Sequence, residues 1–246
     1  MEKKRIEILS PAGSPESLIA AVRSGADAVY LGSSSFSARA AAKNFDNGAL
    51  RDAVAYCHAR NVKVYLAVNT LLHQDELSAV LELIEFACTL PVDALIVQDT
   101  GLVYMLNRCC PEMRLNASTQ MSVHTPSGVR ALKERGFGRV VLSRELSLRE
   151  IQEISKVCGD GIELEAFVHG ALCMSVSGQC YFSALLGSRS GNRGQCAQPC
   201  RLPFSVPDGT GHDLSLKDLS MISRLEELSR AGVSSAKIEG RMKRPE

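Results

Sequence analysis

Four cysteines within one irregular segment are the strongest chemical signal in this sequence. Cys173, Cys180, Cys196 and Cys200 are separated by six, fifteen and three residues, with glycine-rich stretches beside them. Four thiolates from one segment can ligate a tetrahedral metal ion or an iron–sulfur cluster. The lack of a C-x₂-C pair and of histidine partners disfavours an ordinary zinc finger, while the spacing leaves both zinc and iron–sulfur open. Four reduced cysteines in a loop are the alternative without a metal.

Cationic side chains lie among these cysteines and again near the end of the sequence. They are Arg189, Arg193, Arg201, Arg241, Lys243 and Arg244. Guanidinium and ammonium groups bind carboxylates and phosphates, so the pattern predicts a site for a carboxylate substrate or for the phosphates of a nucleic acid. A solvated surface patch that balances acidic residues elsewhere is the alternative interpretation.

Candidates for proton transfer fall near the ends of the predicted strands. His124 and Glu145 follow neighbouring strands and could form an acid–base pair, and Glu239 and His169 are further candidates. His169 and Cys173 are close enough in sequence for a Cys–His nucleophile, which would remove Cys173 from the four-thiolate set. The sequence contains neither H-E-x-x-H nor G-x-S-x-G, so these two hydrolase motifs are absent.

Short apolar strands alternate with helical patterns, and these elements must position the residues above. We predict eight strands, at 6–9, 27–32, 62–68, 94–98, 114–118, 139–143, 164–169 and 235–239. Near-continuous apolar runs are typical of parallel strands buried on both faces. Eight strands with helical connections favour a (β/α)₈ barrel, and a doubly wound open sheet is the second choice.

Active sites of such barrels form at the carboxyl ends of the strands. Those ends are mostly polar in this sequence, which supports a polar cavity at one mouth of the barrel, although strand ends are often polar without any function. The residues concerned are Ser10, Ser33, Asn69, Gln98, Asp99, Ser118, Thr119, Gln120, Arg144, Glu145, His169, Glu239 and Arg241.

One long segment interrupts the alternation before the last strand. Residues 171–217 contain no clear helix but hold the four cysteines, and a loop of that length inside a compact domain is usually functional. We therefore expect a single barrel domain over 1–246 with a Cys-rich insertion at 171–217. The sequence stops at Glu246, soon after the eighth strand, without the helix that would complete the barrel. We expect a fragment whose further C-terminal domain is missing.

Composition restricts the class of protein. Apolar residues make up 45% and charged residues 22% of the chain, and the formal net charge is +1. These values exclude a wholly disordered chain and a globally basic nucleic-acid binder. We find no signal peptide and no apolar run that could span a membrane, so we expect a cytoplasmic protein with reduced cysteines.

The cysteine segment resembles the signature of the peptidase U32 family, also called collagenase-like proteases. The run EAFVHGALCMSVSGQCYFS (165–183) carries the resemblance, and GSRSGNRGQCAQPCRLPF (187–204) is similar to the branch that hydroxylates ribosomal-RNA cytidine. LSPAGSPESLIAAVRSGADAVYLG (9–32), NASTQMSVH, LSRELSL and KIEGRMKRPE (237–246) also match. The resemblance covers essentially the whole chain.

Membership would imply a barrel-like domain and an oxygen-labile 4Fe-4S cluster, with Cys173, Cys180, Cys196 and Cys200 as its ligand candidates. It would also imply O₂-independent hydroxylation of an RNA base, either rRNA cytidine or tRNA uridine, with prephenate as a candidate hydroxyl donor. Arg189, Arg193, Arg241 and Lys243 would then hold the donor's carboxylates or RNA phosphates. A collagenase-like peptidase of unassigned catalytic type and a zinc-stapled binding protein are the alternatives.

Overall fold

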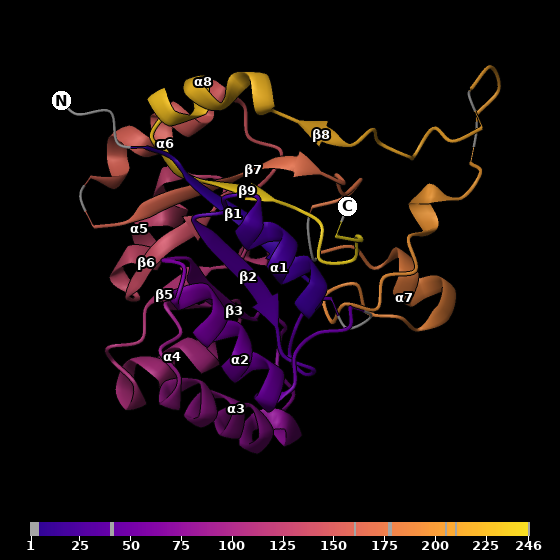
Figure 1. The fold of residues 1–246 in the computed structure, drawn as a ribbon. Coiled ribbons are helices and arrows are strands. Elements are labelled where there is room, and N and C mark those ends of the chain that lie inside the picture. Colours follow the sequence, from indigo (N-terminus) through magenta and orange to yellow (C-terminus); the bar gives the residue numbers. More distant parts are fainter. Residues whose placement is uncertain are drawn as a thin grey trace.

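Eight parallel strands close into a barrel in the computed structural model, which describes residues 5–39, 42–159, 161–176, 179–204, 206–209 and 211–245 (Figure 1). Hydrogen bonds between β6 and β7 complete the ring, so the open-sheet alternative is excluded. Each strand overlaps one of the eight predicted ranges. The strands are β1 (Glu7–Ala12), β2 (Ala28–Gly32), β3 (Lys63–Val68), β4 (Ala94–Val97), β5 (Leu115–Ala117), β6 (Phe137–Val141), β7 (Glu163–Gly170) and β9 (Val233–Ile238).

Helices connect the strands and cover the outside of the barrel, as Figure 1 shows. The capping signals in the sequence are confirmed, because the Ser14 and Thr125 side chains accept amide hydrogen bonds before Pro15 and Pro126. Ser147 forms a capping box with Glu150. The helices are α1 (Pro15–Arg23), α2 (Asn47–His58), α3 (Leu77–Thr89), α4 (Thr100–Cys109), α5 (Pro126–Glu134), α6 (Leu148–Cys158), α7 (Phe182–Gly187) and α8 (Leu225–Arg230).

The apolar core lies between the strands and these helices. Alternate residues of each strand point outward to the helices and inward to the barrel axis. On β3, for example, Val64, Leu66 and Val68 belong to the large outer core, whereas Tyr65 and Ala67 belong to a smaller inner cluster. The structure therefore has one continuous core outside the barrel wall and a separate interior.

A buried ionic network fills the amino-terminal end of that interior. Arg139 on β6 donates to Glu7 at 2.6 Å, to Glu163 at 2.6 Å and to Glu165 at 3.0 Å. Tyr65 and Ser235 also donate to Glu7. This end of the barrel is a packed polar core, so any cavity has to form at the opposite, carboxyl-terminal end of the strands.

The insertion contains more regular structure than the sequence indicated. It includes the short helix α7 and the 3₁₀ turn η3 (Pro199–Arg201), and a second 3₁₀ turn, η4 (Ile222–Arg224), lies just beyond its end. The short strand β8 (Leu219–Ser220) then pairs antiparallel with the end of β7. The expectation of a helix-free segment is therefore wrong for residues 182–187, where six residues form a helix too short to show a periodic apolar pattern. No helix in the described ranges is long and apolar enough to cross a membrane.

Candidate functional site

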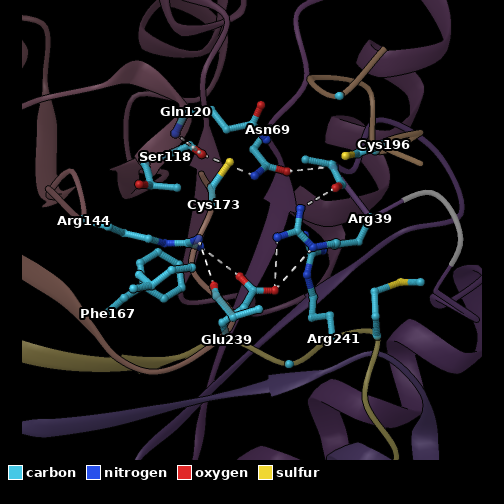
Figure 2. A pocket seen from close by; sticks show the side chains of 18 of the residues that line it. Arg39, Asn69, Ser118, Gln120, Arg144, Phe167, Cys173, Cys196, Glu239 and Arg241 are labelled. Atoms are coloured by element: carbon cyan, nitrogen blue, oxygen red, sulfur yellow. Dashed lines mark hydrogen bonds and ion pairs between the residues drawn. The ribbon is translucent and has the colours of Figure 1, made fainter. Parts of the chain in front are cut away.

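A cavity of about 500 Å³ lies at the carboxyl ends of the strands, beneath the insertion (Figure 2). Its floor comes from barrel strands, which contribute Tyr30, Ala67, Ile96, Phe167 and Lys237. The insertion contributes the opposite wall, with all four cysteines of the predicted metal set. The cavity is large enough for a nucleobase or a small organic acid, and it combines apolar surface with a few polar groups as ligand sites do.

A carboxylate held by arginines lies at the centre of this cavity. Glu239, just after β9, accepts from Arg39 Nε at 3.3 Å and Nη2 at 3.1 Å through Oε1, and from Arg144 Nη2 at 3.2 Å through Oε2. Figure 2 shows the two arginines approaching this carboxylate from opposite sides. Burial raises the pKa of Glu239, but the charges of Arg39, Arg144 and Arg241 outweigh it and leave the pKa below its ordinary value of 4.5. Glu239 is therefore an anion at neutral pH.

Positive charge exceeds negative charge around the cavity. Its described lining has seven cationic side chains against two carboxylates, Glu239 and the exposed Asp218. Arg241 donates to the Ser37 hydroxyl at 2.6 Å, and burial lowers the pKa of its guanidinium to about 10. The Nε of Arg144 is buried and has no hydrogen-bond partner among the residues that the structure describes. A buried excess of donors and positive charge favours an anionic ligand.

A second wall is built from carboxamides and hydroxyls at the ends of β3, β4 and β5. Asn69 accepts from the Ala38 amide at 3.1 Å and donates to Ser118 at 3.3 Å, as Figure 2 shows. Asn192 of the insertion donates to Gln98 at 2.9 Å and to Gln120 at 2.8 Å. These bonds fix the wall and tie the insertion to the barrel. Asn69, Ser118 and Gln120 are strand-end residues predicted from the sequence, and they line this cavity.

The four cysteines are free and line the cavity together. The sulfur of Cys180 accepts from the Phe182 amide at 3.4 Å, and that of Cys196 accepts from the Gln198 amide at 3.3 Å. Burial raises the pKa of the Cys200 thiol; Arg201 opposes this, and the neighbouring Cys173 and Cys196 add to it. Amide donors to sulfur stabilise the thiolate form that a metal requires.

The sulfurs do not form a compact set around one ion. Among the described residues, no three His, Cys, Asp or Glu side chains are close enough together to hold a single metal ion. Tetrahedral zinc with sulfur ligands at ~2.3 Å would need them gathered tightly. A cluster occupies the middle of its ligand set, so its thiolates stand further apart. The thiolate chemistry of the four cysteines and their shared place in the cavity lining fit an iron–sulfur cluster.

Other predicted site residues divide into two groups. Arg189, Arg241, Lys243 and Glu239 line the cavity together with the cysteines. Arg193 does not line it, because its guanidinium pairs with Glu76 and donates to the Leu71 carbonyl on the β3–α3 connection. Its position suits it to holding the insertion on the barrel, and its proposed contact with substrate stays a prediction.

The remaining proton-transfer candidates lie outside the cavity lining. His124 and Glu145 are exposed, and the Nδ1 of His124 lies 2.7 Å from the Ser122 carbonyl oxygen. Within the described ranges no hydrogen bond joins His124 to Glu145 or His169 to Cys173. His169 is exposed because the β7–β9 register shifts between Phe167 and His169, which turns this side chain away from the interior.

Several residues of the site were not among the predicted ones, and Arg39, Phe167 and Lys237 carry charge or an aromatic ring. Arg39 lies in the loop after β2, where no strand end points to it, and it becomes visible only through its pairing with Glu239. Phe167 and Lys237 lie inside predicted strands. The available signal for Lys237 was a lysine within the apolar run SAKIE, two residues before Glu239 and so on the same face of the strand.

The sequence of this chain is similar to a known protein family and to several named proteins. The model of Peptidase family U32 matches residues 13–246. The chain is 42% identical to the "23S rRNA 5-hydroxycytidine C2501 synthase" of Escherichia coli (strain K12), over 97% of this chain and 37% of that protein. It is 33% identical to the "tRNA hydroxylation protein P1" of Bacillus subtilis (strain 168), over 98% of this chain and 60% of that one.

Two further similarities concern proteins named as proteases. The chain is 36% identical to the "Collagenase" of Porphyromonas gingivalis (strain ATCC BAA-308 / W83), over all of this chain and 63% of that protein. A solved structure of a U32 peptidase superposes with a TM-score of 0.68 at 17% identity, covering 96% of this chain and 92% of that one, which supports the fold alone. The chain thus spans between about one third and two thirds of the length of these three curated relatives.

Proposed function

Because the chain belongs to peptidase family U32, we propose that it acts in the hydroxylation of an RNA base, either a ribosomal-RNA cytidine or a tRNA uridine. One observation carries the proposal. A single cavity joins four free cysteines, a cationic wall and a carboxamide wall at the mouth of the barrel. Relatives named for rRNA and tRNA hydroxylation support the RNA substrate.

The proposed cofactor is a 4Fe-4S cluster held by Cys173, Cys180, Cys196 and Cys200. Support comes from the shared cavity and from the amide donors to two of the sulfurs. When bound, such a cluster would supply the redox or Lewis-acid chemistry that amino-acid side chains lack. The insertion holds these cysteines over the cavity, so a substrate in the cavity would lie next to the cofactor.

The carboxamide wall would bind the target base. A base inside duplex RNA is inaccessible, so the enzyme has to act on an unpaired or flipped nucleotide. Asn69 and Gln120 expose amide groups of the kind that read base edges, and Ser118 fixes the orientation of Asn69. Phe167 on the floor would supply apolar surface beside the base.

The cationic wall would bind the source of the hydroxyl group. Arg241 and Lys243, predicted from the sequence, share this wall with Arg39 and Arg144. Paired guanidiniums suit a carboxylate, so a small carboxylic acid such as prephenate is the proposed donor. Glu239 keeps Arg39 and Arg144 in place and, as an anion at neutral pH, can accept a proton but not donate one.

A complementation experiment tests the proposal. A strain that lacks the endogenous hydroxylase would receive the gene for this chain or single-site variants, and hydroxylated nucleosides in rRNA and tRNA would be measured by mass spectrometry. We expect the wild type to restore one modified nucleoside. Cys173→Ser should abolish the modification, whereas Cys109→Ser, an exposed cysteine of α4, should leave it intact.

Metal analysis under anaerobic conditions tests the cofactor separately. We expect about four irons and four sulfides per chain, with absorption near ~400 nm that dithionite bleaches. One zinc per chain would favour the zinc-stapled alternative. Protein cleavage that survives removal of iron would favour the peptidase alternative.

A further inference from the structure

A buried lysine lies where the packed interior of the barrel meets the cavity. The side chain of Lys237 on β9 is 5% exposed and lines the cavity. Along β9, Ser235, Lys237 and Glu239 share one face because side chains alternate along a strand. Ser235 donates a hydrogen bond to Glu7 in the ionic network at the amino-terminal end of the barrel. Glu239 accepts hydrogen bonds from Arg39 and Arg144 at the cavity. Lys237 is therefore the residue of this face that connects the closed core with the ligand space.

The Lys237 amine has one charged hydrogen-bond partner. Its Nζ lies 2.7 Å from Oε1 of Glu165, whose side chain is 1% exposed. The other oxygen of that carboxylate accepts from Arg139 at 3.0 Å, so Glu165 is shared between two cations. A carboxylate shared in this way stabilises the ammonium form less than an exclusive partner would.

The Lys237 amine lies beside two aromatic rings, and the guanidiniums of Arg144 and Arg241 each lie beside one of the same rings. The Nζ of Lys237 lies 4.3 Å from the centre of the Tyr30 ring and 5.7 Å from that of Phe167. The guanidinium of Arg241 lies 5.5 Å from the same Tyr30 ring, and that of Arg144 lies 4.0 Å from the Phe167 ring. Lys237, Arg144 and Arg241 all line the cavity, so a carboxylate bound by these arginines would share it with the amine.

The surroundings also favour the neutral, nucleophilic amine. Burial lowers the pKa of Lys237; Glu165 raises it, Arg241 lowers it further and Glu239 raises it. The balance leaves the pKa below the ordinary value of 10.5. Buried lysines beside other cations are the kind that form imines with carbonyl substrates.

From this geometry we propose that Lys237 forms a reversible imine with a small 2-oxo acid whose carboxylate is held by Arg144 and Arg241. Glu165 accepts a proton from the ammonium, and Nζ then attacks the carbonyl carbon. The carbonyl oxygen leaves as water after taking up two protons, one from the amine nitrogen and one returned by Glu165. Amine and ketone become imine and water, so the step needs neither oxidant nor reductant.

This inference deepens the proposed function and rests on it, because the proposed function makes this cavity the binding site of the hydroxyl donor. It narrows the class of donor from carboxylic acids in general to those with a ketone next to the carboxylate. Such a bond would fix the donor below the base and beside the cysteines.

Chemical trapping tests the imine directly. Anaerobically purified protein would be incubated with pyruvate and sodium cyanoborohydride, which reduces an imine to a stable secondary amine. We expect the intact mass to increase by one reduced pyruvate per chain, with the change mapped to the peptide that contains Lys237. Lactate has the carboxylate without the ketone, so it should slow trapping without being trapped itself.

Variants separate a specific reaction from surface chemistry. Lys237→Arg keeps the charge opposite Glu165 and should lose the adduct, whereas Lys63→Arg, at an exposed lysine of β3, should keep it. Arg144→Gln should raise the pyruvate concentration needed for half-maximal trapping at least tenfold. An unmodified wild type, or an equal adduct in Lys237→Arg, would overturn the proposal and leave Lys237 as a structural ion-pair residue.

The two proposals fail in different ways. Trapping needs neither RNA nor the cluster, so its absence together with normal RNA hydroxylation would contradict the imine alone. Trapping at Lys237 in a protein that restores no modified nucleoside would contradict RNA hydroxylation and keep the imine.

Discussion

At the scale of single residues, the site depends on one carboxylate among arginines. The Glu239 side chain is 13% exposed and accepts hydrogen bonds from Arg39 and Arg144. The Arg144 side chain is 9% exposed and packs against the Phe167 ring, whereas Arg39 is 33% exposed at the cavity wall. Removing one member of a buried ion pair leaves the other charge uncompensated.

Glu239→Gln should therefore destabilise the protein by about 3 kcal/mol or more, the usual size of a broken buried pair. Equilibrium unfolding in urea, followed by circular dichroism, measures the change. The matched control is Glu153→Gln, which breaks an exposed pair with Arg149 on α6 and should alter the free energy of unfolding by no more than ~1 kcal/mol. Equal effects of both variants would contradict the electrostatic account of the cavity.

Acid should unfold the protein through its buried carboxylates. Burial raises the pKa values of Glu7, Glu163 and Glu239, but arginines outweigh it and hold all three below 4.5. A carboxylate with a lower pKa in the folded state contributes stability that is present above 4.5 and is lost as the pH falls through its folded pKa. The urea midpoint should therefore be steady near neutral pH and fall steeply below pH 4.5. Glu7→Gln should flatten that fall, and an unchanged slope would contradict this assignment.

At the scale of elements, the insertion is attached to the barrel by a few polar contacts. Arg193 pairs with Glu76 beside α3, and Asn192 donates to Gln98 and Gln120. Arg201 donates to the Leu172 carbonyl at 3.0 Å and to Ser215 at 2.9 Å within the insertion itself. Elements held in this way open locally at lower free energy than the core does.

Arg193→Gln should loosen the insertion without unfolding the barrel. Limited trypsin digestion should cleave within residues 171–217 several-fold faster than in the wild type, while the thermal midpoint of the barrel changes little. Arg149→Gln removes an exposed arginine of α6 and serves as the control. Cleavage at an unchanged rate would show that Arg193 does not hold the insertion.

The elements were more predictable from the sequence than the site was. Parallel strands covered on both faces have continuous apolar sequences, so all eight strands could be located. The N-caps of α1, α5 and α6 could also be located, from Ser-Pro, Thr-Pro and capping-box patterns. His169 was placed in the site because it ends a predicted strand, but the register shift between β7 and β9 turns its side chain outward. Such a shift depends on the partner strand and leaves no mark in the local sequence. Arg39 could not be found because its role comes from a residue 200 positions away.

At the scale of the whole molecule, two glycines allow the last strand to close the barrel. A Cβ on Gly13 would lie 1.8 Å from the Arg241 carbonyl oxygen, and one on Gly170 would lie 2.6 Å from that of Glu239. Gly170 also has a φ of +107°, which side chains with a Cβ rarely adopt. The backbone that carries Glu239 and Arg241 thus passes between the ends of β1 and β7.

Gly170→Ala should disturb both the closure of the barrel by β9 and the cavity. Backbone strain of ~1–3 kcal/mol would add to the steric clash of the new Cβ with the Glu239 carbonyl oxygen. Thermal unfolding should show a lower midpoint, and the pyruvate trapping described above should weaken. Gly187→Ala places its Cβ in open space at the end of α7 and should leave both unchanged. A Gly170→Ala protein with wild-type stability and trapping would refute the need for this close approach.

The pairing of β9 with both β1 and β7 has a consequence for how the molecule forms. Ser235 and Glu7, bonded across this closure, are 228 residues apart in the chain. Contacts of such sequence separation form slowly, since a long loop has to be ordered before they can stabilise anything. During synthesis the first seven strands would leave the ribosome before Lys237 and Glu239 do. We expect the cavity to be the last part of the barrel to assemble, so a ligand of this cavity could bind only after Lys237 and Glu239 have been synthesised.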